Sequence, residues 1–146
     1  MKPILMRKKL SMPGLIFELK TYFKGIIEPV TNRGSISLSD CLMSGLAIFS
    51  LKYPSLLQFD KSKRETAVAH NLKKLYQIET IPCDTILGER LDELPALELQ
   101  GAFTTLIRQA QRGKALEQCS YYGGHYLLAI DGTGYFYSHD IHCEQC

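Results

Sequence analysis

The hydrophobic pattern changes its period near Cys119, and this change limits the folds open to the chain. Between residues 13 and 117, apolar residues recur at intervals of three and four, which is the spacing of one face of an α-helix. After Cys119, short continuous apolar runs alternate with glycine-containing turns, a pattern typical of β-strands. We therefore expect a mainly α chain, in which a bundle of about four or five helices precedes a C-terminal β-hairpin.

Capping residues and prolines set the expected ends of the helices. A helix capped by Ser37 or Ser39 is expected to stop at Tyr53, because the proline that follows removes the next backbone donor. This helix is apolar on most sides, so we expect it to be buried. Asp84 is expected to cap a helix over residues 85–94, which another proline ends. The remaining predicted helices cover residues 13–23, 66–76 and 96–117.

The charge is spread unevenly along the chain. The 146 residues include 17 basic and 15 acidic side chains, so the formal net charge is +2, too small to predict a nucleic-acid or membrane partner by itself. Residues 1–30 carry a net +4, which leaves −2 for the rest of the chain. The sequence therefore predicts a basic N-terminal arm (1–34), a helical region (35–118) and a hairpin region (119–146).

The apolar runs and the cysteines indicate in which cellular compartment the protein is expected. No apolar run approaches the ~20 residues needed to cross a bilayer, and no long apolar segment follows Lys8 and Lys9 as in a signal peptide. The 5 cysteines are odd in number and scattered, which favours a reducing compartment over a disulfide framework. We expect a cytoplasmic protein that does not associate with membranes.

Asp131 lies at the turn of the predicted hairpin. It follows the apolar strand His125–Ile130 and precedes a Gly-Thr-Gly turn and a second strand, Tyr135–Ser138. A carboxylate held at the end of a strand suits a divalent-metal ligand, but Asp-Gly is also a strong turn dipeptide, so the local pattern leaves both roles open. The Asp-x-Asp-Gly-Thr motif of haloacid-dehalogenase-type phosphatases fits poorly, because Ala129 stands where that motif has its nucleophile.

Three segments together resemble the N-terminal part of DDE transposases of bacterial insertion sequences. They are residues 39–60 (SDCLMSGLAIFSLKYPSLLQFD), 81–94 (IPCDTILGERLDEL) and 126–146 (YLLAIDGTGYFYSHDIHCEQC). In that family a helical N-terminal region, usually assigned to DNA binding, precedes an RNase H-like catalytic core. The resemblance implies that residues 35–118 bind DNA and that residues 119–146 begin a truncated α/β core.

The resemblance also implies a chemistry for Asp131. The first strand of the family's core ends in the first of three metal-binding acidic residues, and Asp131 occupies that position here. In the family, two divalent ions, normally Mg²⁺, activate water or a DNA 3′ hydroxyl for in-line attack on a phosphodiester. The partners implied are the DNA ends of an insertion sequence and, in addition, a full-length transposase or a second copy of this chain.

The chain departs from the family after Asp131. The family's second Asp and its Glu come much later in the sequence, whereas 15 residues follow Asp131 here. Asp140 and Glu144 are too close to Asp131 to stand on the later strand and helix. We therefore expect a transposase fragment that neither binds Mg²⁺ tightly nor catalyses strand transfer. The alternative is a non-enzymatic helical DNA-binding protein or a regulator of transposition.

The C-terminal residues include half of the ligand set of a zinc site. Cys143 and Cys146 have the Cys-x-x-Cys spacing, and His142 lies beside them. A complete tetrahedral site needs further ligands, and a two-residue cysteine spacing is often accidental. The sequence therefore favours the absence of zinc.

A basic cluster in the helical region is the predicted DNA contact. It consists of Lys61, Lys63, Arg64, Lys73 and Lys74. The helices predicted at 66–76 and 84–94 would form a helix-turn-helix unit in which basic side chains contact phosphates. Their connector is long for that motif, and the acidic residues of the second helix suit DNA poorly. Periodicity alone favours an ordinary helical core with a charged face, whereas the transposase resemblance favours DNA binding.

Overall fold

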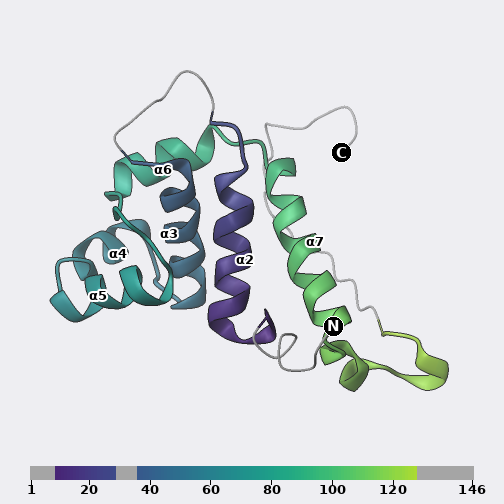
Figure 1. The fold of residues 1–146 in the computed structure, drawn as a ribbon. Helices are drawn as coiled ribbons and strands as arrows, with labels where there is room; N and C mark the ends of the chain where they lie inside the picture. The colour runs from purple at the N-terminus through teal and green to yellow at the C-terminus, as the bar shows by residue number, and fades with distance from the viewer. Residues whose placement is uncertain (1–8, 29–35, 128–146) are drawn as a thin grey trace, which may run out of the picture. The chain divides into compact units, whose positions relative to one another are not determined.

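The computed structural model describes residues 9–28 and 36–127, and this part of the chain is mainly helical, as predicted. The chain divides into two compact units, residues 1–115 and 116–146. The first unit contains the α-helices α2 (Met12–Lys24), α3 (Leu38–Ser50), α4 (Leu56–Ser62), α5 (Thr66–Leu75), α6 (Asp84–Asp92) and α7 (Leu97–Arg112) (Figure 1). Short 3₁₀ helices η1 (Ala115–Cys119) and η2 (Tyr122–Gly124) follow. Among these residues, no helix is both long enough and apolar enough to span a bilayer.

Serine side chains cap the N-termini of three of the helices. Ser11 accepts a hydrogen bond from the backbone N–H of Gly14 at the start of α2, and Ser37 and Ser55 do the same for α3 and α4. Each satisfies a donor that has no partner within its own helix. Of the two serines predicted to cap α3, the structure selects Ser37.

α3 ends three residues before the predicted end at Tyr53. The N–H of Tyr53 donates to the carbonyl of Ile48 (2.9 Å), and the N–H of Lys52 donates to the carbonyl of Phe49 (3.2 Å). These are the two bonds of a Schellman motif, and Lys52 occupies its left-handed position with φ of 57°. The turn therefore ends the helix before the chain reaches Pro54.

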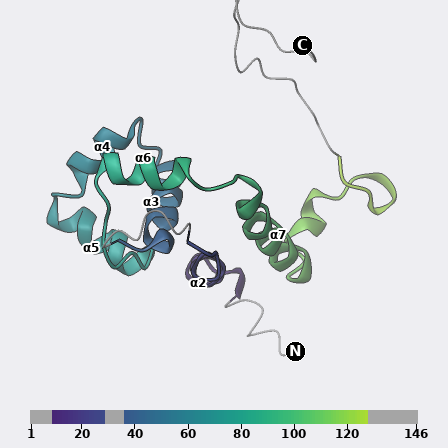
Figure 2. The same cartoon turned by 90° about the horizontal axis from the view of Figure 1, so that it is seen from above.

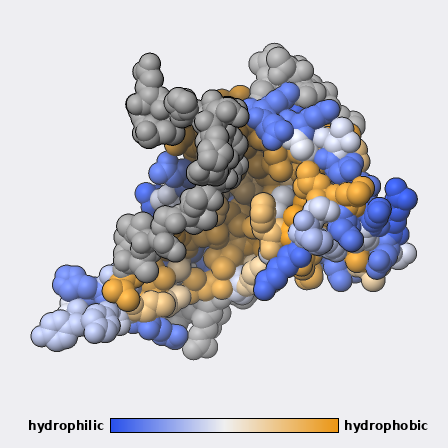
Figure 3. Space-filling view, turned by 180° about the vertical axis from the view of Figure 1, so that it is seen from behind, coloured by the Kyte–Doolittle hydropathy of each residue, from blue (hydrophilic) through white to orange (hydrophobic). Residues whose placement is uncertain are grey.

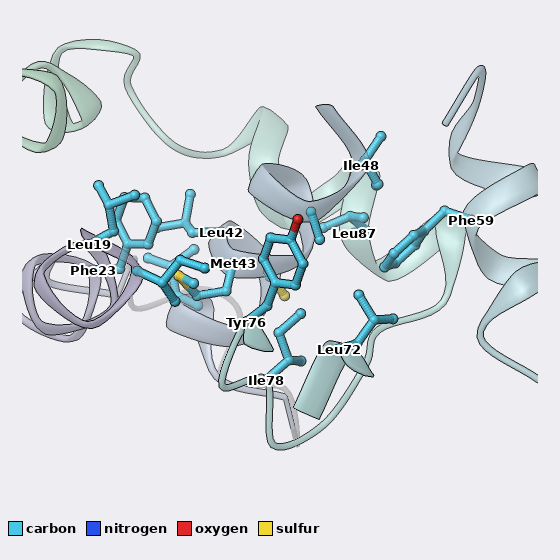
Figure 4. Close-up of a cluster of buried hydrophobic side chains, with 14 of the residues drawn as sticks. Leu19, Phe23, Leu42, Met43, Ile48, Phe59, Leu72, Tyr76, Ile78 and Leu87 are labelled. Atoms are coloured by element: carbon cyan, nitrogen blue, oxygen red, sulfur yellow. The ribbon is translucent and has the colours of Figure 1, made fainter. Parts of the chain in front are cut away.

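The hydrophobic core lies around α3, which is buried along most of its length as predicted. α2 packs against α3 and α7, while α6 packs against α3 and α4 (Figures 1 and 2). Both views place α2 between α3 and α7. In Figure 4, Leu19 and Phe23 of α2 meet Leu42 and Met43 of α3. Residues 12–24 of the segment predicted as an arm thus form a helix whose apolar face joins the core.

Two ion pairs near the start of α3 connect distant parts of this unit. Lys20 of α2 and Asp40 of α3 form a buried pair. Asp40 also accepts hydrogen bonds from the backbone N–H groups of Glu79 (3.3 Å) and Thr80 (3.0 Å). Arg90 of α6 lies 3.3 Å from a carboxylate oxygen of Glu28, and the other oxygen of Glu28 accepts from the N–H of Leu38 at 2.8 Å. These ion pairs and hydrogen bonds therefore connect α2, α3, α6 and the segment after α5 near the start of α3.

α4 was not predicted. The sequence predicted no helix between Tyr53 and Thr66, but residues 56–62 form a helix whose one buried side chain is Phe59. The ring of Phe59 meets that of Tyr53 edge to face, with centroids 5.4 Å apart. Seven residues with a single inward position carry too little periodicity to be recognised as a helix.

The predicted C-terminal β-hairpin is not seen in the part of the chain that the structure describes. The strand expected from His125 is replaced, as far as Leu127, by a single antiparallel bridge between Ser120 and Tyr126. Gly123 and Gly124 have φ of 68° and 79°, so the chain turns tightly before Tyr126. The rest of the predicted hairpin, residues 128–138, lies outside the described residues.

Candidate nucleic-acid interface

The five predicted DNA-contacting residues lie on α4, on α5 and on the turn between them. Lys61 is in the last turn of α4, and Lys63 and Arg64 follow it. Lys73 and Lys74 are in the last turn of α5. All are exposed except Lys63, which is partly buried. The structure therefore places the cluster on one continuous helix–turn–helix segment.

Lys63 differs from the others because intramolecular partners hold it. Its Nζ lies 2.7 Å from Oδ1 of Asp60 and donates to the carbonyl of Pro82 at 2.9 Å. The hydrogen bond from Lys63 is the main reason why the pKa of Asp60 is lowered from its ordinary value. Arg64 approaches the other oxygen of Asp60 only to 4.0 Å, and its side chain is 79% exposed. Lys63 thus fastens α4 to the segment before α6 and is the least available of the five to a ligand.

The helix pair differs from the predicted one. A turn of three residues, 63–65, joins α4 to α5, which is the usual length in a helix-turn-helix unit. The pair predicted from sequence, α5 and α6, is instead separated by the eight residues 76–83. Ile78 and Pro82 of that connector are buried. The short turn makes α4 and α5 the pair to consider.

α6 does not suit a DNA-facing position. It packs against α3 and α4, burying Leu87 and Arg90. Its exposed positions include Glu89, Asp92 and the following Glu93. Carboxylates on that face would repel a phosphate backbone.

α5 presents a face without carboxylates. Its inward side chain is Leu72, while Thr66, Ala67, His70 and Asn71 are exposed along with the two lysines. No residue of α5 is acidic. Residues 60–75 contain five basic and two acidic side chains, a net +3. The whole chain carries +2 and residues 1–30 carry +4, so this segment and the N-terminal residues hold the excess of positive charge, while the rest of the chain sums to −5.

Uncharged side chains of α5 were not predicted as site residues. They lie between two groups of cations, Lys61 and Arg64 on one side and Lys73 and Lys74 on the other. The available signal was the six-residue stretch Thr66–Asn71, which lacks any formally charged residue. It could be interpreted only once α4 was known to precede α5 across a short turn.

An apolar hollow of about 270 Å³ is the second notable surface feature. It lies among α2, α3, α6 and α7, and Figure 3 shows hydrophobic residues gathered on the face seen there. Phe49 and Phe103 line it while remaining 83% and 64% exposed. Its walls provide no charged side chain. The hollow therefore offers no contact for a phosphate.

The remaining predicted site residues lie outside the described residues. They are Asp131, to which the resemblance assigns a Mg²⁺ ligand, and the zinc candidates His142, Cys143 and Cys146. Within residues 9–28 and 36–127, no group of three or more His, Cys, Asp or Glu side chains is placed to hold a metal ion.

The chain was compared with protein-family models, with curated proteins and with solved structures, and none of these matches it.

Proposed function

We propose that this chain is the DNA-binding helical part of a DDE transposase and that α4 and α5 form its DNA-contacting surface. The observation that carries the proposal is the concentration of charge at α4–α5: net +3 in sixteen residues, on a short helix–turn–helix segment whose second helix has no carboxylate. Lysine and arginine side chains bind DNA by neutralising phosphates and releasing counterions. The three segments that resemble transposases supply the biological setting, in which the DNA partner is the end of an insertion sequence.

The test is DNA binding by the purified chain as a function of salt. A fluorescein-labelled 30-base-pair duplex of random sequence is titrated with protein and followed by fluorescence anisotropy. We expect binding at low salt, with log K falling linearly as log salt concentration rises, by about 0.9 for each phosphate contact. Lys73→Gln with Lys74→Gln should weaken binding and lower this slope by about 2.

A charge-matched control separates these contacts from the effect of net charge. Arg108→Gln with Arg112→Gln also removes two exposed basic side chains, but from α7, which both ribbon views place on the other side of α2 from α5 (Figures 1 and 2). This control should retain most of the affinity and the slope. If the wild type fails to bind at low salt, or if both double variants lose equal affinity, the proposal is wrong.

The catalytic part of the proposal concerns Asp131. The resemblance makes it one of three carboxylates that hold Mg²⁺ in the family, and it assigns no second Asp and no Glu to this chain. Two-metal phosphoryl transfer needs a set of carboxylates, since hard cations are held by several oxygen ligands. We therefore propose that the 146-residue polypeptide binds DNA without cleaving it. Cleavage of a supercoiled plasmid with Mg²⁺ or Mn²⁺ that Asp131→Ala abolishes would contradict this.

A further inference from the structure

His70 occupies the outermost position of α5. It lies two residues before the buried Leu72, and two residues turn an α-helix by about 200°, so the two side chains project from opposite faces. Lys74 lies two residues after Leu72 and projects with His70 by the same reasoning. Thr66 lies one turn before His70 on the same face. The stripe Thr66–His70–Lys74 is therefore directed away from the core.

The two ends of α5 have different surroundings. Lys74 and Leu75 line a small hollow of about 190 Å³ together with Met12 and Pro13 of α2, so the C-terminal end of α5 lies close to α2. In the first two turns, the side chains of the outer face are all exposed; they are Thr66, Ala67, His70 and Asn71. The N-terminal half is therefore the part of α5 that a groove of DNA can approach most closely.

The side chains of that half suit base edges better than phosphates. Thr66 and Ala67 are small, which lets the backbone of the helix come near its ligand. The exposed imidazole of His70 has two ring nitrogens that can hydrogen-bond to a base edge. The basic residues that attract phosphates lie before and after this stretch. In helix-turn-helix proteins the N-terminal residues of the second helix contact base edges in the major groove.

From this arrangement we infer that His70 is the residue that selects the DNA sequence, by hydrogen bonding to a base edge in the major groove, while Lys73 and Lys74 contact phosphates. The inference rests on the proposed function. It assigns different roles to residues of α5: Lys73 and Lys74 supply affinity, and His70 supplies sequence preference.

The experiment selects preferred sites from a pool of random 20-base-pair duplexes with the wild-type chain and with His70→Ala, His70→Gln and Lys73→Gln. Affinities for the selected duplex and for its shuffled counterpart are then measured at one salt concentration. His70→Ala should reduce the ratio of the two affinities about tenfold while changing the affinity for the shuffled duplex less than twofold. His70→Gln should select a different base at one position.

Lys73→Gln is the matched control, because it should weaken binding to both duplexes equally and leave their ratio unchanged. A ratio that survives in both His70 variants would overturn the inference and leave the proposed function standing. Wild-type binding with no preference among duplexes would do the same. Absence of binding to any duplex at low salt would overturn the proposed function and the inference together.

Discussion

Lys20 of α2 and Asp40 of α3 form an ion pair inside the core, where their side chains are 6% and 5% exposed. Burial by itself raises the pKa of Asp40, but the hydrogen bonds from Lys20 and from the backbone of Thr80 and Glu79 outweigh it, so the pKa is lowered from its ordinary value. The carboxylate is thus stabilised in its charged form by groups from two other parts of the chain.

Removing one partner of this pair should be costly. We expect Asp40→Asn to reduce the free energy of unfolding by about 3–5 kcal/mol, because Lys20 would remain buried without its counter-ion. Guanidinium chloride titration followed by circular dichroism measures the change. Glu18→Gln is the control, since it breaks the partly exposed pair with Lys9 (3.4 Å) and should cost no more than ~1 kcal/mol. Equal losses in both variants would contradict the assigned role of the buried pair.

The same pair predicts how stability depends on acid. Because the pKa of Asp40 is lower in the folded chain than its ordinary 3.8, the unfolded chain takes up a proton first as the pH falls. The stabilisation is therefore complete above that value and is lost as the pH falls through the folded pKa. Between about pH 5 and pH 2, the unfolding midpoint of Asp40→Asn should fall less steeply than that of the wild type. Parallel curves would exclude Asp40 as a source of the acid sensitivity.

Gly101 allows α7 to lie close to α2. A Cβ at this position would fall 2.6 Å from Cζ of Tyr22, whose hydroxyl donates to the carbonyl of Glu98 at 2.9 Å. Gly101→Ala should therefore destabilise the chain by about 1–3 kcal/mol, measured by thermal melting. In Gly88→Ala, the new methyl would meet Leu56 at 3.9 Å, so this substitution should be neutral or stabilise by up to ~1 kcal/mol. Equal melting temperatures for the two variants would contradict the close approach of Gly101 to Tyr22.

Lys52 is strained by its place in the turn after α3. Its φ of 57° lies in the left-handed region, which glycine adopts without a steric penalty. We expect Lys52→Gly to raise the free energy of unfolding by up to ~1 kcal/mol. Lys52→Ala loses the same charge but keeps a Cβ, so it should show no such gain. Urea titration of the three proteins distinguishes relief of strain from loss of charge.

Two cysteines should differ strongly in reactivity. Cys41 of α3 is fully buried, and burial raises the pKa of its thiol, whereas Cys119 is exposed. Iodoacetamide should therefore modify Cys119 within minutes at pH 8 and leave Cys41 unmodified until the chain is unfolded. Peptide mass spectrometry after timed quenching reports both sites. Equal labelling of the two in the native protein would be inconsistent with the packing of α3.

Sequence periodicity predicted the long helices because each has several inward positions. α2, α5 and α7 have an apolar stripe with a polar opposite face, and α3 is apolar almost throughout. α4 was missed because Phe59 is its single buried residue. The end of α3 was misplaced because it depends on the conformation of Lys52, a residue type that does not signal a helix end.

The candidate interface was predicted in part. The cluster of basic residues was evident from composition, but the helix pair that carries it was not, since that pair depends on α4. The role of Lys63 could not be foreseen either. Its bond to the carbonyl of Pro82 joins residues 19 positions apart, and only the folded chain brings them together.

The two backbone hydrogen bonds from Glu79 and Thr80 to Asp40 have a consequence for α5. These residues follow that helix closely, so its C-terminal end is anchored to the most deeply buried helix of the unit. Lys63 supplies a second anchor just before α5 begins. Under the proposed function, these contacts at both ends would present α5 to DNA already in its bound geometry, so little conformational entropy would be lost when the complex forms.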